Sequence, residues 1–185
     1  MAKTIVVGDG PGGLSAALFL AKAGNEVTVY GKDETAMHYA LLSNYLGITN
    51  ISGSGFQTVG RGQVESFGGG IVDLRVVTVE VTDTGFTVTL EDGSTDSGAW
   101  LILTEGRSPD LAHSLSVKTD AEGTVEVDGN GRSSIDGAYV VGRSVRPKRS
   151  QAIISAGAGA AAALDILSRE AGKDVQDWDS PPKEG

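Results

Sequence analysis

A chain of 185 residues, of which 39% are hydrophobic, is long enough to bury one good core, so we expect a single domain. The sequence has no cysteine, which excludes disulfide bonds, thiolate metal sites, a cysteine nucleophile and a redox-active CxxC pair. Its 24 acidic and 15 basic residues give a net charge of −9, which disfavours binding to nucleic acid or to an anionic membrane, and with no long apolar run we expect a soluble, cytoplasmic protein.

The chain opens with the pattern of a βαβ unit. Residues 3–8 form an apolar, β-branched run that predicts a strand buried on both faces of a parallel sheet. Residues 11–23 favour a helix, and Gly24 stands where a C-terminal cap is expected. Residues 26–31 predict the second strand, joined to the first by a right-handed crossover.

The rest of the chain alternates weak and strong patterns. Residues 33–57 predict a long loop, with a short helical candidate at 35–42. From Gly70 the alternation of apolar and polar residues predicts an antiparallel hairpin or meander that turns at 83–85. Apolar strands are predicted at 99–106 and 138–143, and an edge strand with a turn at 124–134.

A final helix is predicted at 151–171. Gly157 and Gly159 in its interior each cost about 1 kcal/mol relative to alanine, so we expect another backbone to approach the helix closely there. The segment that follows contains two prolines and no periodicity. We therefore expect one nucleotide-binding domain over 1–168, with the helix end and a flexible tail over 169–185.

The cluster "GDGPGG" carries the clearest chemical signal. Gly8, Gly10 and Gly13 match G-x-G-x-x-G between a predicted strand and a predicted helix. In that setting Gly8 makes the tight turn, Gly10 lets backbone N–H groups approach a pyrophosphate, and Gly13 lets the helix pack against the strand. The phosphates then lie at the helix N-terminus, where free N–H groups and the helix dipole favour an anion.

The acidic residue that usually binds the ribose hydroxyls, about twenty positions further on, is missing. The second strand ends with Tyr30, Gly31 and Lys32, and the nearest acids, Asp33 and Glu34, lie beyond the expected position. Lys32 could instead contact a 2′-phosphate, which leaves NADP(H) open as the ligand.

Beyond the glycines, the chain resembles the FAD-binding half of the thioredoxin reductase-like flavoproteins, in the pyridine nucleotide-disulfide reductase superfamily. The segments that carry the resemblance are "VVGDGPGGLSAALFLAKAGNEVTVY", "LSNYLGITNISGSGF", "FTVTLEDGSTDSGAWLILTEGRSP" and "SIDGAYVVGRSVRPKRSQAIISAGAGAAAAL", in the family's order. The resemblance implies an α/β fold: a Rossmann-like FAD-binding domain whose central parallel sheet carries an added antiparallel β-meander. It also implies an oxidoreductase with FAD as cofactor, and makes a redox partner protein and a homodimer possible.

The chain departs from this family in two ways besides its missing ribose acid. The nicotinamide-binding domain that is normally inserted after the turn at Gly106, together with its redox cysteines, has no counterpart here. The family's Gly-Asp, whose carboxylate accepts hydrogen bonds from the flavin ribityl chain, is Gly142-Arg143, and an arginine cannot accept a hydrogen bond. Arg143 also begins a cluster with Arg146, Lys148 and Arg149, which either binds an anion or is a solvated loop.

The motif and the resemblance together place the following residues at the cofactor: Gly8, Gly10, Pro11, Gly12, Gly13, Tyr30, Gly31, Lys32, Asn44, Thr104, Gly106, Gly142, Arg143, Ser150, Gln151 and Ala152. No catalytic residue is assigned, and no metal site is expected, since His38 and His113 are isolated. Three functions remain open: a flavin-dependent oxidoreductase or electron-transfer protein, an NADP(H)-binding protein, and a non-catalytic nucleotide-binding module whose flavin site has degenerated.

Overall fold

A five-stranded parallel sheet organises the computed structural model, which describes residues 2–180. Its strands are β1 (Thr4–Val7), β2 (Val27–Tyr30), β5 (Gly70–Val72), β9 (Trp100–Leu103) and β10 (Ala138–Val140), in the order β10-β9-β1-β2-β5. The chain starts at the centre, builds outward to β5, and returns to the other side of β1 with β9. The strand order therefore reverses between β1 and β9, the position at which α/β sheets bind ligands.

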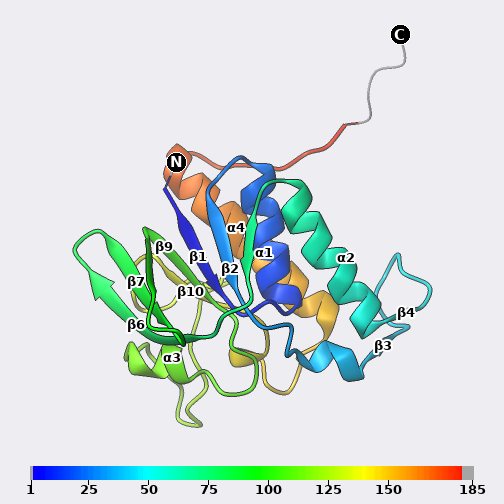
Figure 1. Ribbon diagram of the computed structural model, residues 1–185, viewed down its shortest axis with the longest axis horizontal. Helices are drawn as coiled ribbons and strands as arrows, with labels where there is room; N and C mark the ends of the chain where they lie inside the picture. The colour runs from blue at the N-terminus through cyan, green and yellow to red at the C-terminus, as the bar shows by residue number, and fades with distance from the viewer. Residues whose placement is uncertain (1, 181–185) are drawn as a thin grey trace.

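One face of the sheet is covered by helices, which Figure 1 shows side by side. They are α1 (Pro11–Lys22), α2 (Gly53–Ser66) and α4 (Ala152–Ala171). Small residues let α1 and α4 meet closely, because a Cβ on Gly159 would overlap the carbonyl oxygen of Gly12. The close approach expected in the last helix is thus confirmed at Gly159, whereas Gly157 faces open space.

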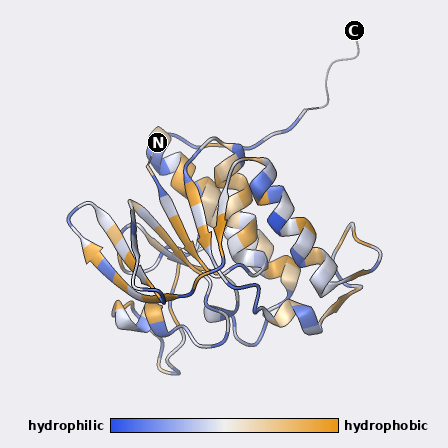
Figure 2. Ribbon diagram, in the orientation of Figure 1, coloured by the Kyte–Doolittle hydropathy of each residue, from blue (hydrophilic) through white to orange (hydrophobic). Residues whose placement is uncertain are grey.

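By length and hydropathy, α4 would be able to cross a membrane, with a mean hydropathy of 1.3. In this fold its apolar residues, such as Ile166 and Leu167, belong instead to the core beneath the sheet. Figure 2 shows how the apolar residues concentrate in the central strands and the adjoining helices. The helix also carries a buried carboxylate, Asp165, so it has the features of a core helix.

The opposite face of the sheet carries an antiparallel meander of β6 (Val76–Thr82), β7 (Gly85–Leu90) and β8 (Thr95–Gly98), with the short helix α3 (Asp110–Ser114) close by (Figure 1). Phe86 and Val88 of the meander pack against Ile5 and Leu101 of the sheet. Both faces are therefore covered, which is why the central strands are continuous apolar runs.

The remaining elements are short. The 3₁₀ helix η1 (Ala36–Tyr39) leads into a small hairpin of β3 (Leu41–Leu42) and β4 (Ile51–Ser52), and η2 (Gly142–Ser144) follows β10. After α4 the chain folds back onto α1, where Lys22 forms ion pairs with Asp177 and Asp179 at 2.7 Å.

The predicted fold class is confirmed: a parallel sheet with a Rossmann-like βαβ start and an added meander. The helix at 151–171 is confirmed within one residue, and Gly24, at φ +84°, directly follows the C-cap Ala23 of α1.

Three local predictions are wrong. Residues 33–57 are not one long loop, because α2 begins at Gly53; its four glycines hide the helical pattern, and Ser52 caps it by accepting a hydrogen bond from the Gly55 N–H. The first residues of the supposed meander, Gly70–Val72, pair with β2 in the parallel sheet. The segment 124–134 forms only isolated bridges, Thr119 with Val125 and Arg132 with Tyr139.

Candidate functional site

A cavity of about 520 Å³ opens at the carboxyl ends of the central strands. Gly8 follows β1, Thr104 follows β9 and Gly142 follows β10, and all three line this cavity. Since β1 and β9 flank the point where the strand order reverses, the cavity lies where α/β sheets place their ligands.

The glycine loop has the geometry that its sequence predicts. Gly8 has φ +101°, a conformation that suits glycine, and a Cβ there would overlap the carbonyl group of Thr104. Gly10 is the N-cap of α1, in extended conformation, and no side chain caps the helix. The free N–H groups of its first turn are therefore available to an anionic ligand.

A second helix N-terminus reaches the same cavity. Gln151 is the N-cap of α4, again without a side-chain cap, and Ser150, Gln151, Ala152 and Ser155 line the cavity. The first turn of α4 contains no acidic residue that would compete for its N–H groups. Asn44, from the β3–β4 hairpin, donates a hydrogen bond from Nδ2 to Gln151 Oε1 at 3.0 Å. The hairpin is thereby tied to the start of α4.

The structure brings together most of the residues that the sequence predicts at the cofactor. Those that line the cavity are Gly8, Gly10, Pro11, Gly12, Asn44, Thr104, Gly106, Gly142, Arg143, Ser150, Gln151 and Ala152. Gly13 lies behind the loop, where a Cβ would overlap the Gly8 carbonyl oxygen, so it has the packing role expected of it.

The end of β2 does not line the cavity. The Tyr30 hydroxyl donates to Asp96 Oδ2 at 2.5 Å, towards the meander, and Lys32 forms an ion pair with Glu91 at 3.0 Å. Gly31 packs against the side chain of Asp9, which a Cβ would overlap. These three residues support the loop and the sheet from outside the cavity.

Sequence reasoning missed several cavity residues. They are Asp9, Glu34, Thr35, Ala36, Met37, Ala40, Leu41, Leu42, Glu105, Arg107 and Ser155. Glu34 is the most informative of them, because it brings an acidic group to the cavity a few residues after β2, past a turn at Asp33 with φ +54°. In the sequence, Glu34 stands as an acidic residue a few positions beyond the place where the ribose-binding acid is usually found.

Two arginines line the cavity, beside the carboxylates of Asp9, Glu34 and Glu105. Arg143 and Arg107 both line it, and within residues 2–180 neither has a carboxylate at ion-pair distance, unlike Arg61, Arg75, Arg132 and Arg169. The Nε of Arg143 is buried and has no hydrogen-bond partner among these residues. A buried donor without an acceptor is costly, so this side chain is suited to an anionic or hydroxyl-bearing ligand.

Glu105, between Thr104 and Gly106, adds a partly buried carboxyl group to the cavity wall. Burial raises its pKa, although the backbone N–H groups of Leu111 and Ala112, which donate to its oxygens at 2.7 and 3.1 Å, oppose that shift.

The rest of the basic cluster lies outside the cavity. Arg146, Lys148 and Arg149 are exposed, and Lys148 is 3.4 Å from Glu122. Only Arg143 of the cluster lines the cavity, because η2 turns the chain away directly after it.

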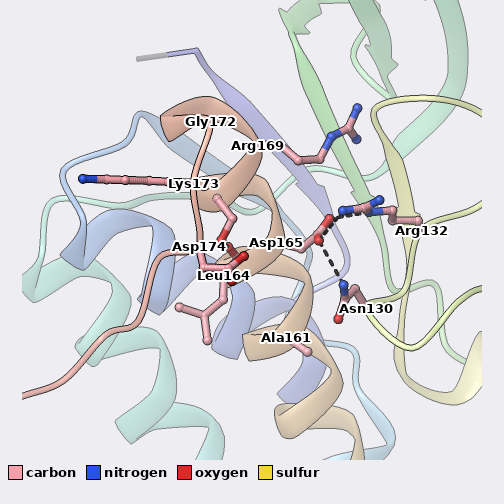
Figure 3. A pocket seen from close by; sticks show the side chains of 10 residues that line it. Asn130, Arg132, Ala161, Leu164, Asp165, Arg169, Gly172, Lys173 and Asp174 are labelled. Carbon is pink, nitrogen blue, oxygen red and sulfur yellow. Dashed lines mark hydrogen bonds and ion pairs between the residues drawn. The ribbon is translucent and has the colours of Figure 1, made fainter.

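Another concave surface lies between α4 and the loop at Asn130, as Figure 3 shows. Asp165 accepts hydrogen bonds there from Asn130 at 3.0 Å, from Arg132 at 2.5 and 2.6 Å, and from the Tyr139 hydroxyl at 2.6 Å. Burial and the bond to Asp165 raise the pKa of Tyr139 to about 12. Each polar group in this network has a partner, so we interpret it as structural. No group of three potential metal ligands occurs within residues 2–180.

The comparisons agree with the fold. Residues 2–75 match the family model described as pyridine nucleotide-disulphide oxidoreductase, and a search of curated protein sequences gave no match. A thioredoxin reductase from Gloeobacter violaceus superposes with a TM-score of 0.85 at 16% identity, covering 97% of this chain and 99% of the other. An atypical thioredoxin reductase from Desulfovibrio vulgaris Hildenborough gives 0.83 at 18% identity, covering 91% and 97%.

A putative thioredoxin reductase from Bacillus anthracis is also similar, with a TM-score of 0.78 at 14% identity, covering 93% of this chain and 99% of that one. At these identities the structural likeness establishes the fold. Together with the matching family model, it confirms the resemblance that the sequence motifs predict. The chain therefore has a Rossmann-like fold similar to that of thioredoxin reductases, and its residues 2–75 match the family model described as pyridine nucleotide-disulphide oxidoreductase.

Proposed function

We propose that the chain binds FAD in the cavity at the carboxyl ends of β1, β9 and β10, and acts as a flavin-dependent oxidoreductase or electron-transfer protein without a redox-active disulfide. The observation that carries the proposal is the convergence of two uncapped helix N-termini, from α1 and α4, on a cavity that follows the G-x-G-x-x-G loop.

The residues that line the cavity are chemically suited to bind FAD. Gly10, Pro11 and Gly12 would hold the pyrophosphate at the start of α1. Glu34, which lines the cavity and pairs with Arg75 at 2.8 Å, would accept hydrogen bonds from ribose hydroxyls. Arg143, whose buried Nε has no partner within residues 2–180, would donate to the ribityl hydroxyls or to a phosphate oxygen. The N–H groups at the start of α4 would stabilise negative charge at the opposite end of the ligand.

Bound FAD would supply the hydride or electron chemistry, whereas the protein binds it, orients it and sets its electrostatic surroundings. Electrons would come from a reduced pyridine nucleotide at an exposed flavin face or from a partner protein. Lys32 gives no support to the alternative of NADP(H) selection, since its ammonium group pairs with Glu91 outside the cavity.

The visible absorption spectrum of the purified protein tests the proposal. A stoichiometric flavin spectrum, or its recovery when FAD is added to the colourless protein, is the expected result. A colourless protein that binds NADPH but not FAD would support the nicotinamide alternative, and one that binds neither would support the non-catalytic module.

Removal of the Arg143 side chain is expected to weaken FAD binding. A charge-assisted hydrogen bond contributes about 1.5–3 kcal/mol, so Arg143→Ala should lower affinity roughly tenfold or more, with a smaller loss at high salt. Isothermal titration calorimetry at two salt concentrations measures both effects. Arg146→Ala is the matched control, because it removes the same charge from an exposed position outside the cavity.

Arg143→Asp introduces the residue that stands at this position in the flavoprotein family that the chain resembles. Tighter FAD binding by this variant would show that the arginine weakens the site and would favour the degenerate module. Weaker binding would show that the cavity is built around a cation. Unchanged affinity in both Arg143 variants would contradict the placement of this side chain at the ligand.

The chain alone should not reduce thioredoxin or glutathione disulfide. Thiol–disulfide exchange needs a thiolate, and the sequence contains no cysteine. The release of thiols from the disulfide, measured with NADPH and FAD and without any second protein, should remain at the background rate. Turnover above that background would refute the proposal of an oxidoreductase that lacks disulfide chemistry.

A further inference from the structure

The glycine loop contains a buried carboxylate, Asp9, between Gly8 and Gly10. Asp9 is only 5% exposed, and it lines the same cavity as the two glycines. If the pyrophosphate of a dinucleotide binds at the start of α1, it shares the cavity with Asp9. Two like charges in a partly buried site repel each other, so an uncompensated Asp9 would oppose ligand binding.

Arg61 from α2 compensates this charge. Its Nη1 donates to Asp9 Oδ2 at 2.5 Å, and its other terminal nitrogen pairs with Asp73, just after β5. The Arg61 side chain is 18% exposed and that of Asp9 is 7% exposed, whereas Asp73 is mostly exposed. The pair with Asp9 is therefore the less screened of the two.

The surrounding contacts hold Asp9 in this position. The Asp33 N–H donates to the same Oδ2 at 2.9 Å, and the fully buried Gln57 donates from Nε2 to the Asp9 carbonyl oxygen at 2.9 Å. Gly31 leaves the space that the Asp9 side chain occupies. As a result, the carboxylate points to α2, and the N–H groups at the start of α1 are left without a side-chain cap.

We propose that Arg61 is a positioning residue of the dinucleotide site, whose ion pair with Asp9 neutralises that carboxylate and lets the glycine loop accept the phosphates of the ligand. The inference rests on the proposed function, since it requires a phosphate-bearing ligand at this loop. It assigns α2 a part in ligand binding although neither Arg61 nor Gln57 lines the cavity.

Calorimetric titration of FAD into four proteins tests this proposal: wild type, Arg61→Met, Asp9→Asn and the double variant. Arg61→Met should weaken binding about tenfold or more, the size expected of one charge–charge interaction in a partly buried site. Asp9→Asn keeps the acceptor for the Asp33 N–H and removes the charge, so alone it should bind FAD at least as tightly as wild type. In the Arg61→Met background it should restore most of the lost affinity.

Arg132→Met is the control, because it breaks a pair with the buried Asp165 (Figure 3). Neither residue lines the cofactor cavity, so this variant should leave FAD affinity unchanged. A merely structural role for Arg61 predicts that Asp9→Asn weakens binding and that the double variant is not rescued, and either result would overturn the inference. If Arg61→Met does not fold, Asp9→Asn alone still tests the inference. Weaker FAD binding by Asp9→Asn than by wild type would contradict the proposal that Arg61 serves to neutralise the Asp9 carboxylate. Wild type that binds no FAD would instead refute the proposed function, and this inference with it.

Discussion

Gly10→Val is expected to abolish dinucleotide binding, with an affinity loss of about 100-fold or more, while the domain still folds. Gly10 has φ −70° and ψ 179°, an extended conformation that valine adopts readily. Among the residues that the structure describes, a Cβ at this position would meet only Thr35 Oγ1, at 3.9 Å. The added methyl groups would therefore extend into the cavity, where the proposed pyrophosphate must approach the backbone.

Calorimetry with FAD gives the affinity, and circular dichroism shows whether the variant is folded. Gly129→Val is a matched control, because Gly129 is exposed and a Cβ there meets nothing within 4 Å. Equal FAD affinity in wild type and Gly10→Val would contradict the assignment of this loop to pyrophosphate binding.

Gly13→Val should act on stability instead. A Cβ on Gly13 would overlap the Gly8 carbonyl oxygen and would lie 2.8 Å from Thr104 Cγ2, so α1 and the glycine loop must move apart. Overpacking of this kind costs about 3 kcal/mol, which in a chain of this length lowers the melting temperature by about 6–12 °C. That loss is a large part of the stability of an ordinary domain, about 5–15 kcal/mol.

Thermal unfolding followed by circular dichroism measures this effect. Gly157→Val makes the same substitution in a helix at an exposed position with open space, so it controls for helix propensity and should not lower the melting temperature. A Gly13→Val melting temperature close to that of wild type would mean that α1 does not pack against the loop through this glycine.

The strongest elements of the fold could be predicted because their signals are local. The apolar run before Gly8 and the alternation around the turn at 83–85 each report burial along a single strand, and both predictions hold. The sequence pattern does not predict helix α2, because Gly53, Gly55, Gly60 and Gly62 weaken its intrinsic helix propensity. Packing against α1 and η1 stabilises this helix in the folded protein.

The features of the candidate site likewise fall into those that a local sequence pattern predicts and those that depend on tertiary packing. The sequence by itself determined the glycine loop and the lack of any cysteine thiol, because a phosphate-binding turn requires glycine at set spacings and thiol exchange requires cysteine. Only the tertiary structure decided that Lys32 pairs with Glu91 outside the cavity, that Glu34 lines the cavity, and that Arg61 reaches Asp9. These contacts join residues separated by up to 59 positions, and such distances depend on how the helices and the meander pack on the sheet, which no local pattern encodes.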